Sequence, residues 1–287
     1  MIVILFPNLL ICGMSHAHIA KIFIFPIKSL GPIALQEASV DALGLMGDRR
    51  FMLVSDTGNF ITQRTRPDLT RFTLELNGLD YLITDQISQM QIGLSIAPEL
   101  GEWVDVTLWD DQIQVREVTG SISAWFSERL QESVRLVQIQ SEAPRAIQTK
   151  YQTQGSQQSS FADSLPILIA SEASYQAVEN HLGAPFDWLR FRANVIIAGI
   201  DAFEEDTWAE FALGDVRLFG AKPCARCQLI NVEPATGQVD KSMLAALSSF
   251  RKVENKVYFG QQAVPITFGH IRVGDEIQVE LTKDAIR

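Results

Sequence analysis

Two of the three cysteines of this chain lie in one short segment, residues 222–237, which reads KPCARCQLINVEPATG. Cys224 and Cys227 are spaced C-x-x-C, with Arg226 between them. The thiolate is the form of cysteine that binds metals, and a neighbouring guanidinium group favours it. The run 228–232 predicts a strand, and the Pro and Gly that follow predict a turn. The segment is therefore a candidate metal or redox site beside a strand.

Spacing alone leaves other interpretations of the cysteine pair open. A structural zinc site needs four Cys or His ligands, and the remaining Cys12 and four histidines form no second paired motif, so no zinc is predicted. A thioredoxin-like site lies at a strand-to-helix junction, whereas a strand and a turn are predicted here. Two inert buried thiols remain a simple alternative, because free cysteine is among the most buried residue types.

Composition excludes several classes of protein. The chain has 287 residues, of which 47% are hydrophobic, so it can build one large domain or two ordinary ones. The formal net charge of −10 argues against nucleic-acid binding and against adhesion to anionic membranes. Three cysteines do not make a disulfide framework, which favours a reducing, cytoplasmic location.

The first residues form an apolar extension, residues 1–16. It lacks the positively charged start of a signal peptide, Pro7 interrupts it, and it is too short to span a bilayer as a helix. A second methionine, Met14, precedes the first convincing strand. We therefore expect an over-extended start, with Met14 as the natural one, and consider a membrane tether the weaker alternative.

Short segments with period-two alternation dominate the first half. After expected strands at 19–25 and 51–54, apolar and polar residues alternate at 72–76, 92–96, 104–108 and 113–115. Such spacing indicates a β sandwich or barrel. One amphipathic helix is expected near 122–130, with Ser121 as its N-cap. Residues 17–140 are therefore predicted to form a β-barrel-like domain.

The second half is predicted to be mainly β with a few inserted helices. Residues 141–160 are polar, contain little that packs, and are predicted to form a linker. Strands are expected at 165–170, 195–198, 216–219 and 277–281, and helices after Ser171 and around 243–247. The predicted fold class is α+β, predominantly β, with the second domain at 161–282.

Separated motifs along the chain resemble one known family. In order they are FPIKS (25–29), GDRRFMLV (47–54), ITQR (61–64), FADSLP (161–166), SEAS (171–174), RFRANV (190–195), EDTW (205–208), CARC (224–227) and VEPATG (232–237). This set resembles the MOSC superfamily in its long form, which has an N-terminal MOSC β-barrel domain before a MOSC β barrel. The similarity is to the amidoxime-reducing components of mitochondria and the hydroxylaminopurine-reducing MOSC proteins of bacteria. Ala193 departs from the family pattern, which has proline.

The resemblance implies a molybdenum cofactor of the molybdopterin type. Cys227 would ligate the metal, with dithiolene sulfurs and oxygens as the other ligands, and Cys224 would support the site. Cationic side chains suit the cofactor phosphate because arginine can bind it through two hydrogen bonds. The implied cofactor-binding residues are Lys28, Ser29, Arg49, Asp163, Ser164, Arg192, Asn194 and Arg226. No pyridoxal phosphate or iron–sulfur cluster is implied.

The resemblance also implies an oxidoreductase that reduces small N-hydroxylated compounds. Neutral or weakly basic substrates are expected, and electrons would come from a separate protein of the ferredoxin, flavodoxin or cytochrome b5 type. Ile230-Asn231 replaces a Thr pair common in relatives, which leaves the substrate preference open. Two alternatives stand beside this function: a cofactor carrier or sulfur-transfer module without its own reductase activity, and a metal-free β-barrel binding protein with inert cysteines.

Overall fold

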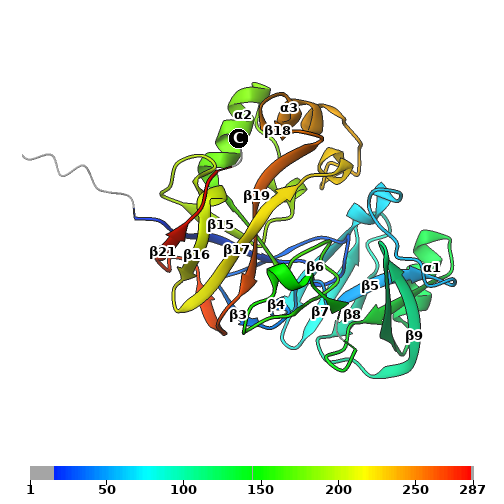
Figure 1. Cartoon of the computed structure of the whole chain (residues 1–287). Coiled ribbons are helices and arrows are strands. Elements are labelled where there is room, and N and C mark those ends of the chain that lie inside the picture. Colours follow the sequence, from blue (N-terminus) through cyan, green and yellow to red (C-terminus); the bar gives the residue numbers. More distant parts are fainter. Residues whose placement is uncertain (1–15, 144, 286–287) are drawn as a thin grey trace, which may run out of the picture.

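The computed structural model describes residues 16–143 and 145–285 (Figure 1). Most of the expected N-terminal extension, with Cys12 and Met14, lies outside the described residues. Within them strands dominate and three α-helices occur, which confirms the predicted α+β, predominantly β class. None of the described helices is long and apolar enough to cross a membrane.

The largest sheet combines strands from both ends of the chain. Its order is β2 (Ile33–Leu35), β1 (His18–Ile24), β15 (Val195–Ala198), β14 (Ile167–Ser171), β19 (Lys256–Pro265), β17 (Val216–Ala225), β16 (Trp208–Leu213) and β21 (Ile277–Thr282), with β18 (Lys252–Val253) paired to β19. Ile22 of β1 pairs with Val195 of β15, so the first described strand completes the sheet of the second half. The predicted domain limits stay a prediction.

Four smaller sheets complete the β structure. They are β5 (Phe51–Ser55), β11 (Val134–Gln138), β10 (Asp111–Val118) and β9 (Leu100–Leu108); β6 (Phe72–Asn77), β7 (Asp80–Asp85) and β8 (Gln91–Ser95); β20 (Gly269–Arg272), β3 (Glu37–Asp41) and β4 (Gly44–Leu45); and β12 (Arg145–Ala146) with β13 (Gln158–Ser159). The described sheets are not closed barrels. β1 contacts the segment that leads into β21 through an isolated bridge between His18 and Glu276 and through backbone hydrogen bonds, such as the one from the Ile277 N–H to the Ala17 carbonyl at 3.0 Å.

The helices lie at the two ends of the molecule. In Figure 1, α2 (Glu172–Leu182) and α3 (Ser242–Arg251) lie together above the large sheet, and α1 (Ile122–Leu130) lies at the far end beside the smaller sheets. Both ends of α2 are capped: Ser171 Oγ accepts a hydrogen bond from the Ser174 backbone N–H at 3.0 Å, and Gly183 adopts a φ of 73°. Short 3-10 helices are η1 (Pro67–Arg71), η2 (Thr149–Tyr151), η3 (Trp188–Phe191), η4 (Glu204–Thr207) and η5 (Gln228–Asn231).

Two local predictions are wrong. The strand expected at 228–232 is the 3-10 helix η5, because the buried Asn231 side chain accepts the backbone N–H of Leu244 at 2.9 Å and ties this turn to α3. The polar segment 141–160 does pack: Ile147 is buried against Leu165 and Val264. A few apolar side chains among many polar ones are enough to hold such a segment on the core.

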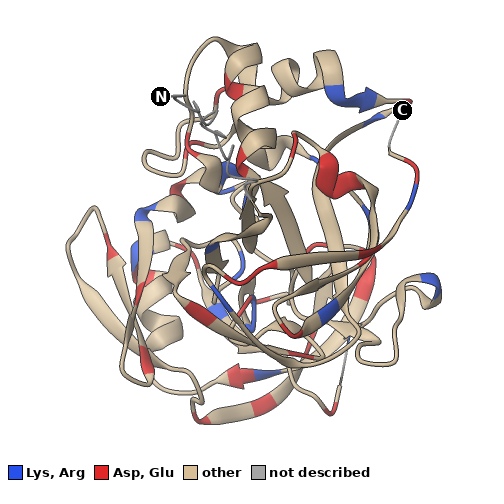
Figure 2. Ribbon diagram, turned by 90° about the vertical axis from the view of Figure 1, so that its left-hand side faces the viewer, with Lys and Arg blue, Asp and Glu red and all other residues tan. Residues whose placement is uncertain are grey.

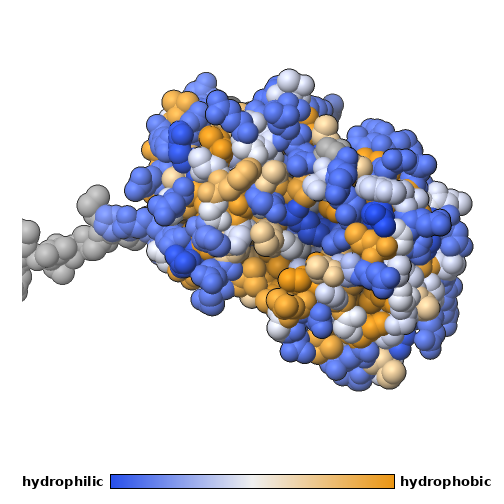
Figure 3. Space-filling view, turned by 90° about the horizontal axis from the view of Figure 1, so that it is seen from below, coloured by the Kyte–Doolittle hydropathy of each residue, from blue (hydrophilic) through white to orange (hydrophobic). Residues whose placement is uncertain are grey.

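Charge and hydrophobicity are distributed unevenly over the surface. Figure 2 shows acidic and basic positions on both halves of the ribbon. Figure 3 shows hydrophobic residues that reach the surface among mainly hydrophilic ones on the face seen from below. Leu76, placed by periodicity on the apolar face of its strand, is 50% exposed, because the end of β6 extends beyond the core.

A buried carboxylate at the start of α2 makes stability depend on pH. Glu205 accepts hydrogen bonds from Ser171 and Ser174, and burial, aided by Asp206, raises its pKa to about 7. A raised folded-state pKa stabilises the protein below pH ~4.5, and this contribution is lost as pH rises through about 7. We expect urea titrations to give a wild-type unfolding free energy that is up to ~3 kcal/mol lower at pH 8 than at pH 5 because of Glu205.

The Glu205→Gln variant isolates this effect, because glutamine keeps a hydrogen-bond acceptor but cannot ionise. Its unfolding free energy is expected to change less between the two pH values than that of the wild type. Identical pH profiles for the two proteins would show that Glu205 is not the group responsible.

Candidate functional site

A cavity and a deeper recess meet at the end of β17. The outer cavity has a volume of about 880 Å³ and the recess about 80 Å³. The two share six lining residues: Arg64, Asp163, Cys224, Arg226, Leu229 and Gln262. The segment 222–237 therefore contributes to both, as a site beside a strand requires.

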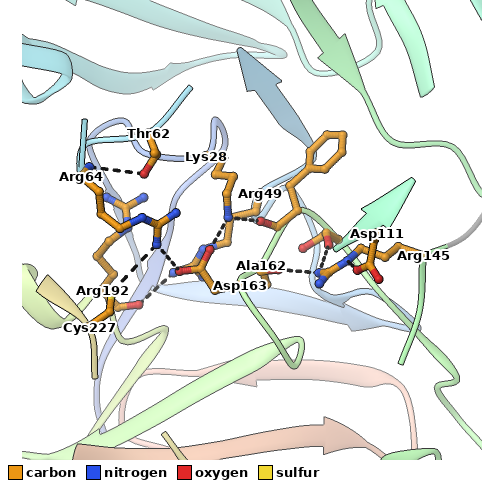
Figure 4. A network of polar contacts seen from close by, with 12 residues as sticks. Lys28, Arg49, Thr62, Arg64, Asp111, Arg145, Ala162, Asp163, Arg192 and Cys227 are labelled. Atoms are coloured by element: carbon orange, nitrogen blue, oxygen red, sulfur yellow. Dashed lines mark hydrogen bonds and ion pairs between the residues drawn. The ribbon is translucent and has the colours of Figure 1, made fainter. Parts of the chain in front are cut away.

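Cationic side chains crowd the recess although the chain as a whole is acidic. Five cations and one carboxylate line it: Lys28, Arg49, Arg64, Arg192, Arg226 and Asp163. Figure 4 shows several of them converging from different segments toward Asp163 and Cys227. Like charges repel in a confined space, so such a cluster is suited to an anionic ligand.

Lys28 and Asp163 form the central ion pair of the recess. The buried Lys28 Nζ donates hydrogen bonds to Asp163 Oδ1 at 2.5 Å and to the Phe161 carbonyl at 2.7 Å. Burial lowers the pKa of Lys28 to about 8, against the opposing effect of Asp163. Desolvation acts to raise the pKa of Asp163, but Lys28 and Arg64 hold it well below its usual range. Both groups are therefore charged at neutral pH.

Arg64 is a residue of the candidate site that sequence reasoning missed. Its Nη1 lies 3.9 Å from Cys227 Sγ and 3.5 Å from Asp163 Oδ2, and its guanidinium group stacks over Trp109 at 4.0 Å. The ITQR motif contained this arginine, but nothing in the sequence indicates that the motif reaches Cys227. Arg64 and Arg226 are the cations that line both the recess and the cavity of the exposed thiol, among the described residues.

Arg192 and Arg226 keep hydrogen-bonding capacity that the described protein does not use. Arg192 Nη1 donates to the Leu30 carbonyl at 2.9 Å, and Arg226 Nη2 donates to the Phe191 carbonyl at 2.8 Å. Arg192 Nη2, Arg226 Nε and Arg64 Nη2 are buried without a partner among the described residues. Burial lowers the pKa of Arg192 to about 9, with repulsion from Arg49 as a further cause, so it remains charged at pH 7. Because unpaired buried donors are costly, these nitrogens are suited to binding an anionic ligand.

Arg49 and Asn194 line the recess, but their polar atoms are used by the fold. Arg49 donates to Asp48, to Asn194 Oδ1 at 2.9 Å and to the Arg192 carbonyl at 2.9 Å. The Asn194 amide donates in turn to the Phe23 carbonyl at 3.1 Å. Ser29 lines the recess, whereas Ser164 lines the outer cavity and not the recess. The structure thus brings the predicted residues together, and their contacts with a cofactor stay a prediction.

Three of the candidate residues have left-handed backbone conformations. The φ angles are 67° at Ser29, 49° at Arg49 and 54° at Arg192. Non-glycine residues adopt this region at a cost of about 1–3 kcal/mol, and such residues cluster at functional sites. The fold therefore holds these side chains at the recess against a local preference.

The two cysteines have different environments. Cys224 is buried, and Arg226 Nη1 donates to its sulfur at 3.1 Å, whereas Cys227 is exposed and lines the outer cavity. Burial acts to lower the pKa of Arg226, but Cys224 and Cys227 raise it above its usual value. Within residues 16–143 and 145–285, no three His, Cys, Asp or Glu side chains form a metal-binding group. A metal at Cys227 would accordingly take its other ligands from a cofactor.

Family comparisons agree with the motif pattern. The model of the MOSC N-terminal beta barrel domain matches residues 16–133, and that of the MOSC domain matches residues 156–278. The mitochondrial amidoxime reducing component 2 of Rattus norvegicus is 31% identical over 278 residues, which cover 90% of this chain and 82% of the relative. The chain belongs to the MOSC family.

Further relatives of this MOSC protein have two kinds of name. The mitochondrial amidoxime-reducing component 1 of Xenopus laevis is 30% identical over 278 residues, covering 90% of this chain and 81% of the relative. The molybdenum cofactor sulfurase of Oryza sativa subsp. japonica is 29% identical over 270 residues, covering 86% of this chain but only 32% of that protein. The family prediction is confirmed, and these names point to an association of the MOSC protein with the molybdenum cofactor.

Proposed function

We propose that this MOSC protein is a molybdenum-cofactor oxidoreductase that reduces N-hydroxylated compounds, with Cys227 as the protein ligand to the metal. The observation that carries the proposal is the cationic recess beside an exposed thiol, with buried guanidinium nitrogens that lack partners. A pterin cofactor offers a phosphate for such donors and sulfur ligands that complete a thiolate-bound metal.

Different residues of the protein would have different roles at this site. Arg64, Arg192 and Arg226 would bind the anionic end of the cofactor, since each retains an unpaired buried donor. Asp163 fixes Lys28 and Arg64 by ion pairs and keeps the recess from accumulating unbalanced positive charge. When bound, the cofactor supplies the two-electron chemistry that breaks an N–O bond, with two protons, to give an N–H compound and water. The electrons would come from a separate electron-transfer protein.

The test is a measurement on the full chain purified from a host that makes the molybdenum cofactor. Elemental analysis is expected to find near-stoichiometric molybdenum, and the protein is expected to reduce benzamidoxime with an artificial electron donor. Metal without reduction would favour the cofactor carrier instead. Absence of metal after cofactor-competent expression would refute both functions.

Arg64 provides a second, more specific test. Arg64→Ala is expected to lower molybdenum affinity or kcat/KM by about 10- to 100-fold, because partners that orient a metal site typically contribute this much. Arg66→Ala is the matched control: Arg66 forms ion pairs with Asp68 and Glu132 and lines neither cavity. Equal effects of the two substitutions would contradict the assigned role of Arg64.

A further inference from the structure

The mouth of the outer cavity carries a second set of cations, distinct from those of the recess. Four lysines line it: Lys150, Lys222, Lys256 and Lys283. They come from η2, β17, β19 and the segment after β21. The convergence of ammonium groups from four separate segments on one opening is a feature of the fold and not of a single basic run.

Most of these lysines are not neutralised by the described protein. Among residues 16–143 and 145–285, no carboxylate forms an ion pair with Lys150, Lys222 or Lys256. Two of the three carboxylates in the same lining are committed elsewhere: Asp163 pairs with Lys28 and Arg64, and Asp206 pairs with Arg251. The third, Asp284, forms no ion pair among the described residues, so one free carboxylate faces four lysines. The cavity mouth is therefore locally cationic in a protein of net charge −10.

Two aromatic rings line the same cavity as the lysines and the thiol. The ammonium groups of Lys150 and Lys222 both lie 4.9 Å from the centre of the Tyr151 ring. Trp109, which is 42% exposed, lines the same cavity and stacks against Arg64. Trp109 offers a flat ring on which a planar molecule can stack, and the ammonium groups that lie over Tyr151 offer an electrostatic partner for a negative group on that molecule.

We propose that the preferred substrates are planar N-hydroxylated compounds that carry a phosphate or carboxylate away from the N–O group. The N–O end would face Cys227, the ring would lie along Trp109, and the anion would contact Lys150 and Lys222 over Tyr151. This inference rests on the proposed function, since it names the substrates of the same site. It differs from the expectation of neutral or weakly basic substrates drawn from the sequence, because that expectation could not include lysines brought together only by folding.

The kinetic test compares two substrates that differ by one negative charge, benzamidoxime and 4-carboxybenzamidoxime, with an artificial electron donor. The wild type is expected to show a lower KM for the carboxylated compound, and this preference should weaken with added salt because exposed charges are screened. The double variant Lys150→Gln/Lys222→Gln is expected to raise KM for the carboxylated compound by about tenfold and to leave KM for benzamidoxime unchanged. Lys241→Gln, an exposed lysine outside both cavities, is the matched control.

A binding measurement separates this inference from the proposed function. Calorimetry with adenosine 5′-monophosphate and with adenosine tests the phosphate form of the anion without any turnover. For the wild type, the monophosphate is expected to bind about tenfold more tightly than adenosine. For the double variant, the two compounds are expected to bind with equal affinity. If the molybdenum-loaded protein reduces neither amidoxime, the proposed function fails. The calorimetric comparison then still shows whether Lys150 and Lys222 bind an anion.

Several results would overturn the inference. Equal KM values for the two amidoximes together with equal binding of the two adenosine compounds would exclude a substrate anion site. Loss of molybdenum from the double variant would assign the lysines to the cofactor. A third result would assign the lysines to docking of an acidic partner. In that case the double variant would keep its substrate kinetics and show a raised KM only for a natural electron-transfer protein.

Discussion

Replacing Cys227 with alanine is expected to remove molybdenum from the purified protein and to abolish reduction of benzamidoxime. Cys227 is exposed at the cavity, and Arg64 lies 3.9 Å from its sulfur. Alanine cannot supply a thiolate, so the cofactor would lose its covalent attachment while the cationic recess remained. Elemental analysis and the rate of benzamidoxime reduction measure the two effects separately.

Cys224→Ser is the matched control for this prediction. Serine keeps an acceptor for the Arg226 hydrogen bond, which is the contact that Cys224 makes in the recess. We expect this variant to retain most of its molybdenum and its activity. If the serine variant lost metal and the alanine variant at Cys227 kept it, the assignment of the two cysteines would be reversed.

Asp48→Ala is expected to lower the free energy of unfolding by about 3–5 kcal/mol, because it leaves a buried charge without its partner. Asp48 is fully buried; its Oδ2 accepts from Arg49 at 2.6 Å and its Oδ1 from the Phe25 backbone N–H at 2.8 Å. The substitution would also leave Arg49 beside the positively charged Arg192. Urea titration of the cofactor-free protein measures the stability without a contribution from ligand binding.

An exposed ion pair provides the comparison for Asp48. Glu37 pairs with Arg272 at 3.0 Å, and both side chains are more than 60% exposed. Glu37→Ala is therefore expected to change the free energy of unfolding by less than about 1 kcal/mol. A similarly small effect at Asp48 would mean that the Asp48–Arg49 pair behaves like an ordinary surface pair.

Sequence reasoning succeeded where one local pattern determines an element. The helix at 122–130 and the strand at 195–198 have the predicted bounds, and α2 begins after Ser171 as expected. It missed β19, which has no period-two pattern: its C-terminal part is buried on both faces and includes Gln261 and Gln262. Alternation of apolar and polar residues identifies strands that have one solvent-exposed face, and a strand buried on both faces lacks that pattern.

The candidate site could be predicted only in part, for a related reason. Lys28, Arg49, Arg192 and Arg226 were found through motifs, and the structure places all four at the recess. Arg64 and the lysines of the cavity mouth were not found, because their proximity to Cys227 depends on long-range packing. Local sequence also gave no sign that the polar atoms of Asn194 are occupied by Arg49, Leu168 and Phe23.

The pairing of β1 with β15 sets a constraint on biosynthesis. Ile22 leaves the ribosome long before its partner Val195 is synthesised. The separation is larger still for β3, whose partner β20 lies at residues 269–272. Contacts between distant segments slow folding, because the intervening chain must be ordered before the strands can pair. The edge of β1 would remain open during synthesis, and an exposed edge strand can pair with another chain. A fragment limited to residues 156–278 would lack β1, so we expect it to aggregate unless the N-terminal half is produced with it.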